Sequence, residues 1–121
     1  MRNHLTAVDQ RLKAEGIKPE VDEPLQRGEQ IAYVPTHALR WAGTGGAMWA
    51  IDFHPDVEFG FVTSQRGSTV FCRYWRKGHP GELRTVANSE GAPADCLVRH
   101  KSVSDALIAE TLARIETETT R

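Results

Sequence analysis

The spacing of hydrophobic residues is helical near both ends of the chain and typical of short strands between them. Residues 3–16 carry an apolar stripe at helical spacing, formed by Leu5, Val8 and Leu12, which predicts a helix. A second stripe follows Ser102 and Ser104, either of which can serve as an N-cap. It predicts another helix within residues 101–121 and consists of Leu107, Ile108, Leu112 and Ile115.

Between these ends, runs of β-branched, aromatic and alternating apolar residues predict short strands. The expected strands cover residues 30–34, 58–64, 68–75, 83–87 and 97–99. Gln65, Arg66 and Gly67 separate the second run from the third, and a three-residue loop that ends in glycine predicts a hairpin in which Gly67 has positive φ. The remaining segments are expected to be an extended arm at 18–29, an irregular stretch at 36–57 and a turn-rich loop at 88–95.

Strands this short leave unpaired edges unless the sheet closes on itself, because an edge strand exposes free N–H and C=O groups. We therefore expect a mainly β fold with flanking helices (α+β), built on a small SH3-like barrel. A flat sheet with one open face is the alternative. In a single domain of 121 residues, the expected parts are an N-terminal helix and arm at 1–29, a barrel at 30–100 with an inserted loop at 39–53, and a C-terminal helix at 101–121.

The composition is that of an ordinary globular protein. Lys and Arg number 15 and Asp and Glu 16, so the net charge of −1 demands neither nucleic acid nor a membrane surface. The sequence has no apolar run of about 18 residues and no signal-peptide pattern at its start. We therefore expect a cytoplasmic protein in which Cys72 and Cys96 are buried and reduced, a disulfide between them being the less favoured alternative.

Residues with catalytic or metal-binding chemistry form no strong motif. Zinc sites usually contain closely spaced ligand pairs, and the cysteines and histidines show no Cys-x-x-Cys or His-x-x-x-His pair. His54, Asp56 and Glu58 offer groups for acid–base chemistry, but Pro55 makes a turn the favoured interpretation. The glycine-rich segment 43–46 lacks the lysine of a phosphate-binding loop. We expect no metal, no cofactor and no enzymatic activity.

Four stretches between residues 28 and 100 carry a resemblance to a known family. They are Gly28-x-Gln30-Ile31-Ala32-Tyr33-Val34-Pro35-x-His37-Ala38, His54-Pro55-Asp56-Val57-Glu58-x-Gly60-x-Val62-x-Ser64, Val70-Phe71-Cys72-Arg73-Tyr74 and Asp95-x-Leu97-Val98-Arg99. Together they resemble a small family of short proteins encoded by phages and other mobile genetic elements. The resemblance implies an SH3-like barrel and that genomic context, but no catalytic or binding residue. The insertion 39–53 and both helical ends lie outside it.

The insertion 39–53 is the first candidate binding segment, because it places large apolar side chains beside closely spaced glycines. Such a segment either packs over the barrel or is held out as an interface, where aromatic and methionine side chains are enriched. We expect a non-enzymatic module that binds a protein of the host cell, for example an anti-CRISPR-like inhibitor or modulator of host or defence machinery. The candidate protein-binding residues are Trp41, Met48, Trp49 and Phe53.

A nucleic-acid-binding SH3-like module is the alternative function. Residues 73–101 hold six basic and three acidic side chains, and aromatic groups beside cations on a strand suit base stacking and phosphate contact. The competing interpretation is a solvated hairpin tip, since this surplus of charge is modest for a nucleic-acid-binding protein. The candidate residues are Arg73, Tyr74, Trp75, Arg76, Lys77, Arg84, Arg99 and Lys101.

Overall fold

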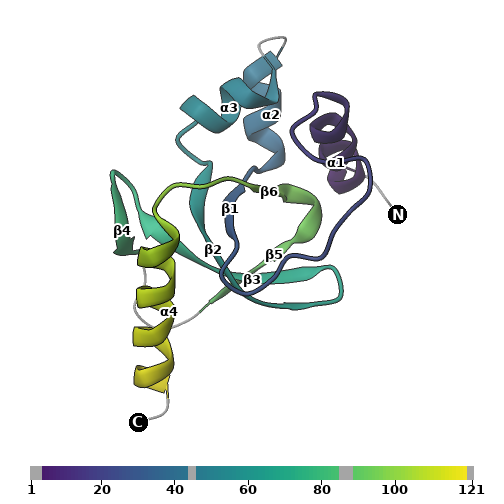
Figure 1. The fold of residues 1–121 in the computed structure, drawn as a ribbon. Helices are drawn as coiled ribbons and strands as arrows, with labels where there is room; N and C mark the ends of the chain where they lie inside the picture. Colours follow the sequence, from purple (N-terminus) through teal and green to yellow (C-terminus); the bar gives the residue numbers. More distant parts are fainter. Residues whose placement is uncertain (1–3, 44–45, 85–88, 120–121) are drawn as a thin grey trace.

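The fold is a single antiparallel sheet with a helix at each end of the chain and a helical pair between the first two strands (Figure 1). The computed structural model describes residues 4–43, 46–84 and 89–119. The elements in chain order are α1 (His4–Ala14), β1 (Gln30–Tyr33), α2 (Thr36–Ala42), α3 (Ala47–Phe53), β2 (Glu58–Arg66), β3 (Thr69–Arg76), β4 (His79–Leu83), β5 (Glu90–Pro93), η2 (Ala94–Cys96), β6 (Leu97–Arg99) and α4 (Asp105–Thr119). No helix among the described residues is long and apolar enough to cross a membrane.

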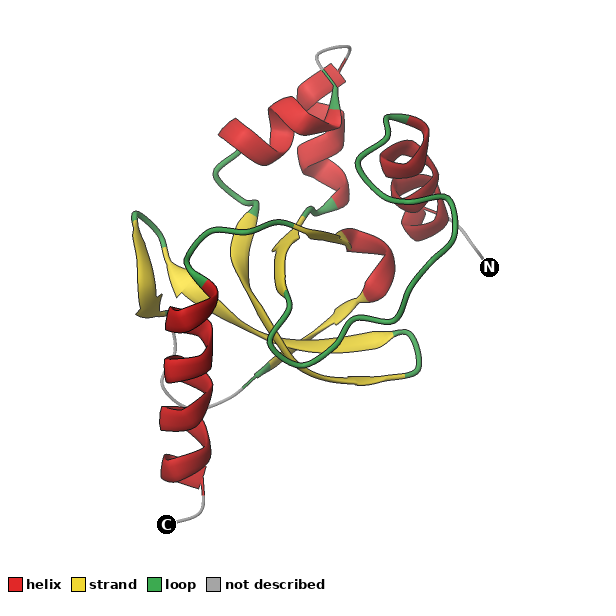
Figure 2. Cartoon of the chain, viewed as in Figure 1, coloured by secondary structure: helices red, strands yellow, loops and turns green. Residues whose placement is uncertain are grey.

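The long strand β2 holds the sheet together, because it pairs with β1 over its first half and with β3 further along. The strand order is β4-β3-β2-β1-β6, and β5 pairs with the first half of β3 (Figure 2). At Gly60 the strands β2 and β3 approach so closely that an added Cβ would overlap the backbone carbonyl of Arg73. This position therefore requires glycine.

The predicted hairpin is confirmed, with a shorter loop than expected. Arg66 pairs with Thr69, so Gly67 and Ser68 alone form the connection between β2 and β3. Gly67 has φ of 60°, as predicted, whereas no described residue other than glycine has positive φ. Glycine at the first of two loop positions is the pattern of a type II′ turn, whose twist matches that of the flanking strands.

The predicted class, mainly β with flanking helices, is confirmed at the level of an α+β fold, but the prediction of a closed SH3-like barrel is wrong. The strand β5 runs through η2 directly into β6, yet β5 pairs with β3 and β6 pairs with β1. Within the described residues these two strands form no ladder with each other, so the sheet stays open. Helices and the extended arm cover part of it instead.

Two further predictions concern the second half of the sheet. Only the first two residues of the strand expected at 83–87 are described, and Leu83 ends the strand β4, which begins at His79 because Gly78, with φ of 76°, permits a tight turn after β3. Pro80 concealed this strand in the sequence, but proline is tolerated in an edge strand. Residues 85–88 lie outside the described part of the chain. The loop expected at 88–95 contains the strand β5.

The segment 36–57, expected to be irregular, forms the two short helices α2 and α3 instead. Each helix buries small or aliphatic residues at helical spacing. These buried residues are Ala38, Leu39 and Ala42 in α2, and Ala47, Ala50 and Ile51 in α3. The insertion 39–53 therefore contains α3 and the second half of α2, and the two helices stand on the sheet at the top of Figure 1, with α1 beside α2.

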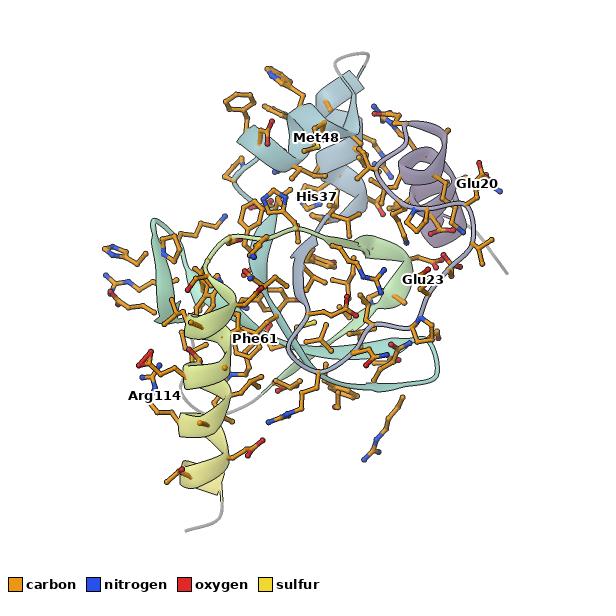
Figure 3. The ribbon with its side chains drawn as sticks, in the orientation of Figure 1. Glu20, Glu23, His37, Met48, Phe61 and Arg114 are labelled. Atoms are coloured by element: carbon orange, nitrogen blue, oxygen red, sulfur yellow. The ribbon has the colours of Figure 1, made fainter. Side chains whose placement is uncertain are left out.

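The two terminal helices confirm their predictions. In α1, Val8 and Leu12 belong to one buried cluster with residues of α2, α3 and the sheet, and Gly16 follows the helix with φ of 76°. In α4, the hydroxyl of Ser104 accepts the N–H of Leu107 at 3.2 Å, so Ser104 rather than Ser102 is the N-cap. Ile108 then packs on the face of the sheet that carries Phe61 and Trp75, and Figure 3 shows Phe61 beside α4.

Replacing Gly67 with valine tests the turn. Nothing lies within 4 Å of the position of an added Cβ at Gly67, so the cost arises from the positive φ alone. We expect Gly67→Val to lower the free energy of unfolding in urea by more than about 1 kcal/mol. Thr69→Val, an exposed and nearly isosteric change in the adjacent strand, should change it by less than about 0.5 kcal/mol. Equal effects of the two changes would contradict the assigned turn.

Candidate protein-binding surface

Three aromatic side chains on the outer side of the α2–α3 pair form one continuous surface. Trp41 of α2 stacks on Trp49 of α3, with ring centroids 5.0 Å apart and an angle of 10° between the planes. Phe53, one turn after Trp49, lies 5.5 Å from it. His54 lies at the edge of this surface, and its ring packs edge to face with that of Trp41, with centroids 4.9 Å apart. We call Trp41, Trp49 and Phe53 the aromatic face.

The aromatic face is exposed, and the small side chains of the same helices are buried. Trp41 is 49% exposed, Trp49 43% and Phe53 65%, and Met48 beside them is 46% exposed. In contrast, Ala38, Ala47 and Ala50 have no exposed surface. The sequence predicted that these four large residues act together but left open whether they pack inward. They face outward.

Arg11 of α1 and Glu15, which directly follows that helix, hydrogen-bond the ends of the short helices that carry the aromatic face. Arg11 donates to the carbonyl of Leu39 at 2.9 Å and to that of Gly43 at 2.8 Å, at the end of α2. Glu15 accepts the first N–H of α3, from Ala47, at 2.6 Å. The hydrogen bond from Arg11 and then that from Ala47 lower the pKa of Glu15 below its ordinary value, so Glu15 is ionised at neutral pH. Helices this short need such partners for their terminal groups.

A groove of about 360 Å³ borders the aromatic face, between α3 and the turn from β3 to β4. Phe53 lines both the groove and the aromatic face, which makes the two continuous. Pro55, Pro80 and Trp75 add apolar surface to its wall, and Lys77 adds a charge. A flat aromatic surface beside a groove is suited to anchoring side chains of another protein.

A polar cluster lies where the α2–α3 pair meets the sheet, and Figure 3 shows His37 at that end of α2. The ring nitrogen Nε2 of His37 donates to Oδ2 of Asp56 at 2.6 Å. The backbone N–H of Asp56 donates to Nδ1 of His54 at 3.0 Å, which confirms the turn expected there. The hydrogen bond from His37 lowers the pKa of the Asp56 carboxyl. Sequence reasoning missed His37, because it lies 17 positions before His54.

The aromatic residues of the alternative, nucleic-acid-binding set are buried. Tyr74 is 6% exposed and Trp75 5%, so neither ring presents a face on which a base could stack. Arg73, which precedes them on β3, is also only 5% exposed. Arg84 lies over the ring of Tyr74, at 5.5 Å from its centroid, and covers it.

Most cations of this set form ion pairs within the chain. The pairs and their distances are Arg76–Glu82 at 2.9 Å, Arg84–Glu58 at 3.1 Å, Arg84–Glu90 at 2.8 Å, Arg99–Glu29 at 2.6 Å and Lys101–Asp105 at 3.2 Å. Of the exposed cations in the set, Lys77 alone has no carboxylate within ion-pair distance among the described residues. The set therefore forms no unpaired cationic surface of the kind that binds phosphates.

Comparison with protein-family models, curated proteins and solved structures finds no match for this chain. The geometry of the aromatic face and of its surroundings is thus the basis on which a function can be argued.

Both cysteines are buried free thiols, and burial raises their pKa from the ordinary 9.0 to about 11. A shift of two units lowers the thiolate fraction at pH 8 about a hundredfold. We expect Cys72 and Cys96 in the native protein to react with iodoacetamide at least about 100 times more slowly than in urea. Mass spectrometry of the labelled denatured protein should then count two thiols. Rapid labelling of either cysteine in the native state would contradict their burial.

Proposed function

We propose that this protein is a non-enzymatic binding module that docks on another protein through the aromatic face. The observation that carries the proposal is that α2 and α3 bury mainly small side chains and expose their largest ones, which is the reverse of the usual arrangement. Alanines fill most of the inner side, together with Leu39 and Ile51, and the large aromatic side chains are turned toward solvent. A contiguous exposed patch of this kind usually serves an interaction.

The aromatic face has the composition and rigidity of an interface core. Tryptophan is the residue type most enriched among the few that dominate binding energy. The stacking of Trp41 on Trp49 holds both rings in place before binding, which reduces the entropy lost in the complex. The exposed charged residues Arg40 and Asp52, next in sequence to Trp41 and Phe53, supply the polar rim that surrounds such a core.

The partner that fits this surface is a protein with an apolar ridge or side chains that enter the groove beside Phe53. We propose a partner in the host cell, such as a component of its defence machinery, from the residue pattern at 28–100 that we compared with phage and mobile-element proteins on the sequence alone. Burial of Tyr74 and Trp75 and the pairing of the nearby cations argue against nucleic acid as the ligand.

Capture with matched variants tests the proposal. The immobilised full chain is exposed to nuclease-treated lysate of the host, in parallel with Trp41→Ala/Trp49→Ala and with Val21→Ser. Val21 is 76% exposed and lies outside the aromatic face. We expect wild type and Val21→Ser to retain the same protein, and the double variant to retain at least about tenfold less, since loss of one anchor costs about 2 kcal/mol. Circular dichroism must show all three to be folded.

Three results would overturn this function. The first is equal capture by the double variant. The second is loss of capture in Arg76→Glu/Lys77→Glu with retention in the double variant, which would favour the basic segment. The third is a wild-type protein that sediments as a dimer while the double variant is monomeric, because the aromatic face would then be covered by a second copy.

A further inference from the structure

The polar cluster at the base of the α2–α3 pair combines three metal-ligating side chains from different parts of the chain. One ring nitrogen of His37, one of His54 and a carboxylate oxygen of Asp56 all lie within 4.8 Å of one another. His37 belongs to the first turn of α2, His54 directly follows α3, and Asp56 precedes β2. The helical pair brings them together.

This combination of ligands fits a first-row transition-metal dication. Imidazole nitrogen and carboxylate oxygen bind Zn²⁺ at about 2.0–2.2 Å, and two ligands of one tetrahedral ion lie about 3.3 Å apart. His37 and Asp56 now share a hydrogen bond of 2.6 Å, and their side chains are 57% and 60% exposed. Small rotations of these two exposed side chains therefore suffice to admit an ion between them.

His54 is held in place by contacts of both its backbone and its ring. Its backbone N–H donates to the carbonyl of Ala50 at 2.8 Å, and its ring rests against the edge of Trp41. Because Nδ1 accepts the N–H of Asp56, this nitrogen carries a lone pair in the neutral ring. Coordination at Nδ1 would replace that hydrogen bond, and coordination at Nε2 of His37 would move the ring proton to its other nitrogen.

We propose that His37, His54 and Asp56 bind one Zn²⁺ ion or a similar transition-metal dication, with water in the remaining position. The site adjoins the aromatic face through His54, but metal binding does not depend on the docking function proposed above. Ligand spacing in the sequence did not indicate it, because His37 lies at least 17 positions before the other two ligands, which share the connection between α3 and β2. The positive charge of Lys77 acts on Asp56 and opposes the binding of a cation, which offers a control.

Titration of the untagged, chelator-treated full chain with Zn²⁺ alone tests the site. Calorimetry should show one saturable site per chain. Co²⁺ should give a visible spectrum of nitrogen and oxygen coordination, and it should quench tryptophan fluorescence, because the ring of Trp41 contacts that of His54. Asp56→Asn and His37→Ala, changes of exposed residues, should each weaken binding more than about tenfold, as even the loss of a residue supporting a ligand does.

Two variants serve as controls. His79→Gln removes another exposed histidine, which lies 3.6 Å from Glu82, and should leave Zn²⁺ affinity unchanged. Lys77→Ala removes a like charge and should bind Zn²⁺ at least as tightly as wild type. The absence of saturable one-to-one binding would overturn the proposal, as would binding that survives both ligand variants or is lost in His79→Gln. The cluster would then be a hydrogen-bonded turn alone.

Discussion

Close packing of the α2–α3 pair through alanine side chains is the constraint on which the rest of this structure depends. Ala38, Ala47 and Ala50 have no exposed surface and share one buried cluster with Ala32 and Val98 of the sheet. The indole rings of the same helices consequently lie on the outer side. The position of the aromatic face, the groove beside it and the cluster around His54 all follow from this arrangement.

The helix α1 makes this arrangement stable, because helices of seven residues do not persist alone in water. Arg11 and Glu15 satisfy the terminal carbonyls of α2 and the first N–H of α3, and the same two side chains form an ion pair at 2.9 Å. The N-terminal helix thus belongs to the construction of the surface. The sheet supplies the platform, in which Gly60 lets β2 and β3 approach closely.

The sequence predicted those parts of the fold whose signals are local. The terminal helices have regular apolar stripes, and the β2–β3 hairpin has Gly67 at a position that demands positive φ. The short helices α2 and α3 were missed, because their ends are satisfied by α1 rather than by residues next to them. The strand β4 was misplaced because Pro80 argues against a strand except at an edge. Whether the sheet closes depends on pairing between distant strands, which no local pattern encodes.

The candidate site was only partly accessible from the sequence for the same reason. Composition singled out Trp41, Trp49 and Phe53, but the direction in which they point depends on the packing of alanines around them. The basic segment looked like a unit in the sequence, yet Tyr74 and Trp75 lie in the interior. The spacing of His37 and His54, 17 positions apart, did not indicate a common cluster, which forms because the helical pair brings the two side chains together.

The free energy of unfolding of Trp41→Ala/Trp49→Ala, measured in urea without any partner, tests the central claim most directly. If the rings serve an interface, their removal should lower the free energy of unfolding by less than about 2 kcal/mol, because half-exposed stacked rings contribute no more than this to stability. Leu12→Ala, a change at a fully buried position, provides the reference, with an expected loss of about 2–5 kcal/mol. A loss above about 5 kcal/mol in the double variant would exceed that of one fully buried core tryptophan and would contradict this account.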